Sequence, residues 1–117
     1  MKYFRRTLYI NWLSKNKNTD TVKFITGIHG IGKTKLMLDY IGDIYKSESD
    51  PNVLYIDFNI PHHGRYMDPE ELRKRLDSEY LEGSFNYVII DGAQLCGNID
   101  ELVKCLNDII GYDIYII

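Results

Sequence analysis

The sequence is short of cysteine, of proline and of long hydrophobic runs, and each shortage excludes a class of protein. Its two cysteines, Cys96 and Cys105, have a spacing that fits neither a disulfide framework nor a zinc cluster. Three prolines and 44% hydrophobic residues exclude a collagen-like or disordered chain. No apolar stretch approaches the roughly 18 residues that cross a bilayer, and the first residues lack a signal-peptide cleavage site. We therefore expect a cytoplasmic protein with reduced thiols and no membrane partner.

Positive charge is also in short supply. Lys and Arg together number 14 against 17 Asp and Glu, which gives a net charge of -3 in 117 residues. A protein that binds nucleic acid through a broad basic face has the opposite balance, and the Arg5–Arg6 pair is too short to form such a face. Nucleic acid is therefore not indicated as a partner, and the chain has the length and composition of one small globular domain.

Hydrophobic periodicity predicts an N-terminal helix followed by alternating strands and helices. Apolar side chains at helical spacing mark the helix within residues 1–15. Short runs of β-branched and aromatic residues predict strands, and the segments between them carry apolar stripes with a helical period. The expected strands are residues 22–26, 52–58, 87–90 and 114–117. Such alternation gives right-handed crossovers, so we expect an α/β fold in which helices cover both faces of a parallel sheet.

Two of the expected helices have recognisable start signals. Asp68 has the features of an N-cap, with proline at the next position and Glu71 where a capping box requires it. Asn98 is expected to cap the last helix, whose apolar stripe runs as far as Ile110. Residues 59–67 are expected to form a loop with solvated histidines, because a metal site there lacks acidic or cysteine partners at suitable spacing.

The segment from Gly27 to Thr34 reads GIHGIGKT and matches the Walker A pattern in full. Its glycines let the backbone turn tightly and direct successive N–H groups at phosphate oxygens, and the helix that starts near Lys33 adds the positive end of its dipole. Lys33 would bind the β- and γ-phosphates, and the Thr34 hydroxyl would ligate Mg²⁺. The expected nucleotide-binding residues are Gly27, His29, Gly30, Ile31, Gly32, Lys33, Thr34 and Lys35.

A magnesium site beside a phosphate loop also needs a carboxylate at the end of a neighbouring strand. Asp91 follows four apolar residues and would lie at the carboxyl edge of the sheet, where folds of this kind place their ligands. Asp57 follows a similar apolar run and occupies the same kind of position. The local pattern favours Asp91 only modestly, so both residues are candidates for the metal.

These motifs resemble the prokaryotic AAA+-type P-loop ATPases, in which an ATPase core precedes a C-terminal domain of poorly defined function. The likeness covers nearly the whole chain, from an opening helix through the phosphate loop to the last predicted strand. The stretches that carry it are Arg6–Tyr9 with Trp12–Leu13, Phe24–Gly27 with Gly32–Thr34, and Tyr87–Asp91 with Gln94 and Asp113–Ile116.

The resemblance implies a protein that binds ATP and Mg²⁺, with Lys33 and Thr34 on phosphate and metal and Asp91 on the metal. It also implies a three-layer P-loop fold whose four strands adopt the spatial order 1-4-3-2. Residues 22–117 would be the nucleotide-binding core, and residues 1–117 the N-terminal part of a larger ATPase domain. We expect hydrolysis and a possible homo-oligomer of the complete protein, and negligible turnover by these residues alone.

The sequence departs from the family pattern at two places. His29 and Gly30 stand where the family has arginines, and the phosphate loop remains intact in generic form. Gly92 stands where the family has a glutamate that orients or deprotonates the attacking water, a function that contributes ~10²–10⁴-fold to a rate. Gln94 is the remaining candidate for orienting that water. A nucleotide-binding regulatory or assembly module with little hydrolysis is therefore the alternative to an ATPase, and a P-loop kinase is a third reading.

Overall fold

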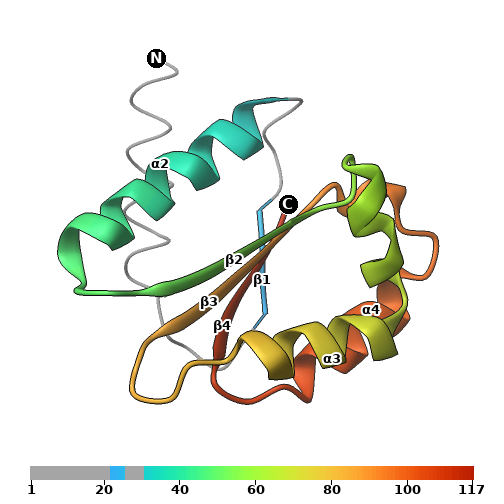
Figure 1. Ribbon diagram of the computed structural model, residues 1–117. Helices are drawn as coiled ribbons and strands as arrows, with labels where there is room; N and C mark the ends of the chain where they lie inside the picture. Colours follow the sequence, from blue (N-terminus) through green and yellow to red (C-terminus); the bar gives the residue numbers. More distant parts are fainter. Residues whose placement is uncertain (1–21, 26–30) are drawn as a thin grey trace.

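The computed structural model describes residues 22–25 and 31–117, so the predicted N-terminal helix and Gly27, His29 and Gly30 of the phosphate loop lie outside the described residues. Four parallel strands form one sheet in the order β1-β4-β3-β2, which confirms the predicted order (Figure 1). The strands are β1 (Lys23–Phe24), β2 (Asn52–Asp57), β3 (Asn86–Asp91) and β4 (Tyr112–Ile116).

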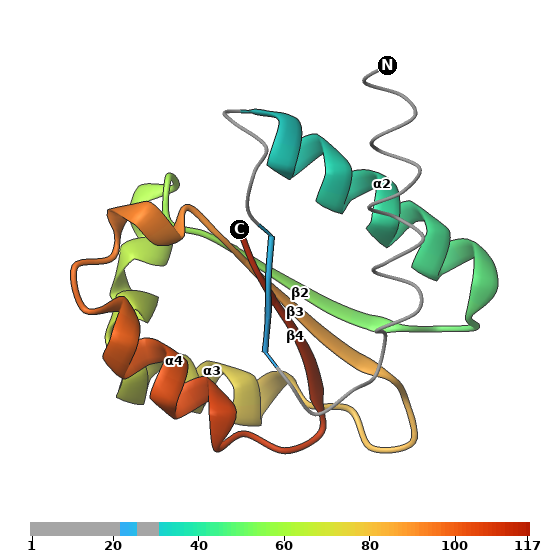
Figure 2. The same ribbon diagram turned by 180° about the vertical axis from the view of Figure 1, so that it is seen from behind.

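Helices cover both faces of this sheet, as the alternating pattern predicted. The helix α2 (Ile31–Ser47) lies on one face, whereas α3 (Pro69–Glu79) and α4 (Ile99–Asn107) lie together on the other (Figures 1 and 2). Two short 3₁₀ helices, η1 (Pro61–Met67) and η2 (Ala93–Leu95), follow the carboxyl ends of β2 and β3. Among the described residues, no helix combines the length and hydrophobicity that crossing a membrane would require.

The core is divided by the sheet into two apolar clusters because strand side chains alternate between its faces. Every residue of the central strand β3 is buried, as expected for a strand covered on both faces. On one face the stripe of α2 packs on the sheet through Leu36, Met37, Tyr40, Ile44, Tyr87, Ile89 and Tyr115. On the other face the stripes of α3 and α4 pack on the sheet through Leu72, Leu76, Leu102, Leu106, Ile56, Val88, Ile90 and Ile114.

The cluster beneath α2 also contains a buried polar network that joins three elements. Lys23 of β1 forms an ion pair with Asp113 of β4, and both side chains are almost fully buried. The Tyr115 hydroxyl donates to the second carboxylate oxygen of Asp113 at 2.7 Å, and the hydroxyls of Tyr115 and Tyr40 are hydrogen-bonded at 2.9 Å. Buried charges are tolerated only when they are paired and hydrogen-bonded in this way. The network therefore ties β1 to β4 and to α2.

The boundaries of two helices, α2 and α4, differ from the predicted ones. The helix α2 begins at Ile31, two residues before its predicted start, so Gly32 and Lys33 belong to its first turn. The helix α4 ends at Asn107, and Ile110 is 92% exposed, which makes its assignment to the buried stripe wrong. The reason is that the chain must leave the helix early in order to turn at Gly111, whose φ is +96°, and enter β4 at Tyr112.

The predicted side-chain N-cap is confirmed for α3, and the one predicted for α4 is wrong. The Asp68 side chain accepts a hydrogen bond from the Glu70 backbone at 3.1 Å, but Glu71 pairs with Arg65 and Lys74 and so does not complete a capping box. At α4 the Asn98 side chain makes no cap hydrogen bond. Its amide instead donates to the Met67 carbonyl at 3.2 Å, which fastens the start of α4 to the end of η1.

Candidate functional site

The candidate site lies where the first turn of α2 meets the carboxyl ends of β2 and β3. Thr34, in the first turn of α2, donates a hydrogen bond from Oγ1 to Asp91 Oδ2 at 2.8 Å. Asp91 is the last residue of β3, and only 7% of it is exposed. Two residues that are 57 positions apart in the sequence, and that were both predicted to hold a metal, are therefore in direct contact.

The start of α2 is suited to binding an anion. Its first turn contains no acidic residue, so no side chain there opposes the positive end of the helix dipole. Lys33 lies half-buried and Lys35 exposed in this segment, and neither forms an ion pair with another residue in the ranges 22–25 and 31–117. The backbone of Ile31 and Gly32 belongs to the same turn. Lys33 and Lys35 therefore add positive charge near the end of the helix where the dipole is positive.

Tyr55 is a member of this site that the sequence analysis missed. Its hydroxyl donates to the same oxygen, Asp91 Oδ2, at 2.6 Å. Tyr55 belongs to β2 and is in register with Ile89 of the neighbouring strand β3. Asp91 lies two residues further along β3, so the side chain of Tyr55 reaches it diagonally. Burial, and then the hydrogen bond and charge of Asp91, raise the pKa of Tyr55 far above its ordinary value of 10. The hydroxyl therefore remains a protonated donor.

Asp57, the rival carboxylate, is engaged in a turn. It lies opposite Asp91 in the register of β2 and β3, but its Oδ1 accepts hydrogen bonds from the backbone and the side-chain amide of Asn59, both at 2.9 Å. Its own backbone N–H donates to His63 Nδ1 at 2.9 Å. His63 is thus a half-buried structural residue, and the expectation of a solvated histidine is wrong there, whereas His62 is exposed.

Within the described ranges, no group of three or more histidine, cysteine or acidic side chains is arranged to hold a metal without other ligands. Mg²⁺ does not need such a cage, because it keeps several waters and takes its remaining ligands from one or two protein groups and from phosphate. Of the two strand-end carboxylates, Asp91 is the one that contacts Thr34.

Gly92 has a structural reason to be glycine. Its backbone is left-handed, with φ +83° and ψ 30°, a conformation that side chains disfavour. A Cβ at this position would also lie 3.1 Å from the side-chain nitrogen of Asn59. The N–H groups of Gly92 and Ala93 both donate to the carbonyl of Ile117 at 3.1 Å, which fixes this turn against the end of β4.

Gln94, predicted as a candidate for orienting water, lies in η2 and is exposed. No hydrogen bond within the described part of the chain joins its side chain to Thr34, Tyr55 or Asp91. The structure therefore places Gln94 after the same strand as Asp91, but outside the group of side chains that are bonded to one another there.

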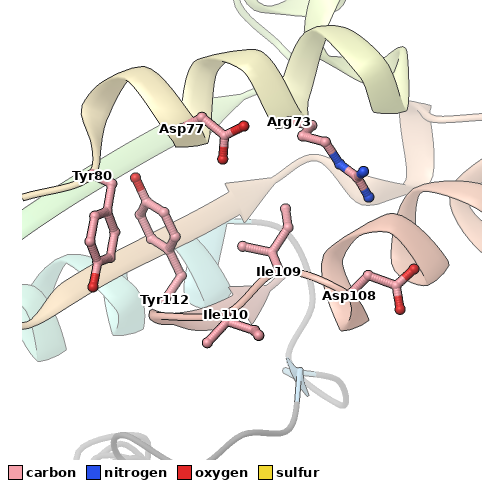
Figure 3. Close-up of a pocket in the computed structure, with 7 residues that line it drawn as sticks. All are labelled: Arg73, Asp77, Tyr80, Asp108, Ile109, Ile110 and Tyr112. Atoms are coloured by element: carbon pink, nitrogen blue, oxygen red, sulfur yellow. The ribbon is translucent and has the colours of Figure 1, made fainter.

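A cavity of about 520 Å³ lies far from these residues, at the opposite edge of the sheet, between the end of α3 and the turn into β4 (Figure 3). Its lining mixes one basic, two acidic, two aromatic and two aliphatic side chains, and contains no residue of the candidate site. These residues are Arg73, Asp77, Tyr80, Asp108, Ile109, Ile110 and Tyr112.

Comparison with known proteins identifies a family for this chain. A family model described as an AAA domain matches residues 19–117, a span that includes the whole phosphate-loop motif, Tyr55 and Asp91. Comparisons with curated proteins and with solved structures gave no match. Because the family model covers most of the chain and the described strands have the predicted order, the chain belongs to the AAA domain family.

Proposed function

We propose that residues 22–117 form a nucleotide-binding core that holds ATP and Mg²⁺ between the Walker A segment Gly27–Thr34 and Asp91. The observation that carries this proposal is the 2.8 Å hydrogen bond from Thr34 to Asp91, which joins the end of the Walker A segment to the end of β3. Membership of the AAA domain family supports ATP as the nucleotide. The phosphates would lie at the start of α2, where N–H groups and the helix dipole favour anions.

The side chains at this point fit a magnesium ion. Hydroxyl and carboxylate oxygens are ligands that Mg²⁺ prefers, and the 2.8 Å hydrogen bond between Thr34 and Asp91 supports the proposal that both act on one ion. Thr34 would bind it directly, with Asp91 accepting from a metal-bound water. Bound Mg²⁺ would neutralise charge on the β- and γ-phosphates, which Lys33 would contact from the same turn of α2.

Hydrolysis of ATP by the complete protein is the activity that family membership favours, and Gly92 is the observation that favours a second candidate. The left-handed backbone at Gly92, together with the contact that a Cβ would make with Asn59, excludes a strain-free glutamate at this position. Gln94 remains the proposed residue for orienting water, and it is exposed. A regulatory or assembly module that binds nucleotide but turns it over slowly is therefore the second candidate.

Thermal stability measured with and without Mg²⁺–ATP tests the binding proposal. A ligand at 100 times its dissociation constant stabilises the folded state by about 2.7 kcal/mol, which is easily seen in a melting curve. We expect Lys33→Ala to lose this stabilisation. Lys46→Ala, which removes a lysine from the opposite end of the same helix, is the matched control and should keep it. A Lys33→Ala variant with an undiminished shift would show that the Walker A assignment is wrong.

Release of phosphate separates the two candidate functions. An ATPase would show steady turnover that Asp91→Asn abolishes, since that change removes the carboxylate from the metal site. A binding module would show a shift in melting temperature with negligible turnover in the same buffer. Turnover that depends on Asp91 would rule out the binding module.

A further inference from the structure

Asp91 Oδ2 is held by two hydroxyl groups that come from different elements of the fold. Thr34 donates to it from α2 at 2.8 Å, and Tyr55 donates to it from β2 at 2.6 Å. Hydrogen bonds between hydroxyls and carboxylates at such distances are charge-assisted and stronger than neutral ones. The carboxylate is therefore fixed between a helix on one face of the sheet and the strand beside its own.

The second carboxylate oxygen is in a different situation. In the part of the chain that the structure describes, no donor is hydrogen-bonded to Asp91 Oδ1. A carboxylate whose one oxygen is clamped by two donors cannot rotate to exchange its oxygens without breaking both bonds. The clamp therefore decides which oxygen faces a ligand.

We infer that Tyr55 is a positioning residue of the magnesium site, which orients Asp91 so that Oδ1 can accept from a water bound to the metal. This inference rests on the proposed function. Thr34 donates to the same oxygen from α2, but as the proposed metal ligand it must also meet the geometry of the ion, so the donor from β2 supplies a second, separate restraint. Tyr55 restrains Asp91 from the side of β2.

The chemistry of Tyr55 suits this role. Its phenol has one O–H to donate, and in the structure that group is hydrogen-bonded to Asp91 Oδ2 at 2.6 Å. The ring is carried by a strand that is in register with β3 along its whole length. Side chains that hydrogen-bond to a metal ligand and so orient it typically contribute 10–100-fold to metal affinity.

The test is a Tyr55→Phe variant of the full chain, which removes one hydroxyl and leaves the ring. Tyr112→Phe is the matched control, since it also removes a hydroxyl that is hydrogen-bonded within the fold, at the Leu76 carbonyl and far from the site. ATP affinity is measured across a Mg²⁺ titration and again in excess chelator. For Tyr55→Phe we expect the Mg²⁺ concentration at half-maximal effect to rise about 10-fold or more, with metal-free affinity unchanged. Tyr112→Phe should match the parent protein in both measurements.

Other outcomes would overturn the inference in different ways. An unchanged Mg²⁺ midpoint in Tyr55→Phe means that Thr34 alone orients Asp91. An equal loss of affinity with and without Mg²⁺ means that Tyr55 supports the fold and not the metal. If the parent protein itself shows no Mg²⁺-dependent binding of ATP, the proposed function fails first, and the inference falls with it.

Discussion

Replacing Gly92 with glutamate would restore the side chain that AAA+-type ATPases carry after the strand-end aspartate, and we expect it to destabilise the protein without creating an ATPase. A side chain in the left-handed conformation costs about 1–2 kcal/mol, and the φ of Gly92 is +83°. Its Cβ would lie 3.1 Å from Asn59 Nδ2, which is itself held at 2.9 Å by Asp57. At roughly 4 °C per kcal/mol for a domain of this size, the melting temperature should fall by about 4–8 °C.

Circular dichroism melting curves of Gly92→Glu and Gly92→Ala measure this cost, since alanine brings the strain without the carboxylate. Gly42→Ala is the control of opposite sign, because Gly42 lies inside α2 and, apart from its chain neighbours and the backbone of its own helix, no described atom lies within 4 Å of where a Cβ would be. It should gain about 0.5–1 kcal/mol. We expect phosphate release to be no faster in Gly92→Glu than in the parent. A glutamate variant that is as stable as the parent, or that hydrolyses ATP faster, would refute this account of the turn.

Three further predictions concern stability. Lys23→Met removes the ammonium partner of a buried carboxylate, Asp113, and should cost about 3–5 kcal/mol in urea denaturation. Asp68→Ala removes the N-cap of α3 and should cost about 1 kcal/mol in the same assay. Burial raises the pKa of Tyr40 and Tyr112 to about 12. These two tyrosines therefore lose their protons at a lower pH in the unfolded chain than in the folded protein. The free energy of unfolding should hold below pH 10 and fall as the pH rises to 12. The fall should be less steep in Tyr112→Phe.

The sequence was sufficient for the order of elements, because each strand and helix carries its own period. The stripe of α4 at Leu102 and Leu106 is buried as predicted. Ile110 continues the same period and is exposed, because the chain has already turned toward β4. Periodicity reports which residues could share a helical face, but where the helix stops depends on the distance to the next strand.

Residues that act across the sheet were harder to predict. Asp91 and Asp57 follow similar apolar runs, and the local pattern favoured Asp91 only modestly. The structure separates them, because Thr34 of α2 contacts Asp91 and Asn59 engages Asp57. Tyr55 looked like one more residue of a strand, since nothing in its local sequence points to Asp91. Its place two residues before Asp57, combined with the predicted adjacency of the two strands, was the signal that could have found it. Lys23 and Asp113 are 90 positions apart, and no local pattern in the sequence indicates that they pair.

The pairing of β1 gives the protein a particular order of assembly during synthesis. Among the described strands, β1 pairs only with β4, through Lys23 with Tyr115 and Phe24 with Ile116. A chain emerges from the ribosome amino end first, so the strand that leads into the phosphate loop is made early and must wait for β4, the last of the four. The sheet beneath α2 can begin with β2 and β3, but a nascent chain arrested before Tyr112 would lack the partner that holds the phosphate-loop strand in place. Nucleotide should therefore be captured only by chains whose translation has passed β4.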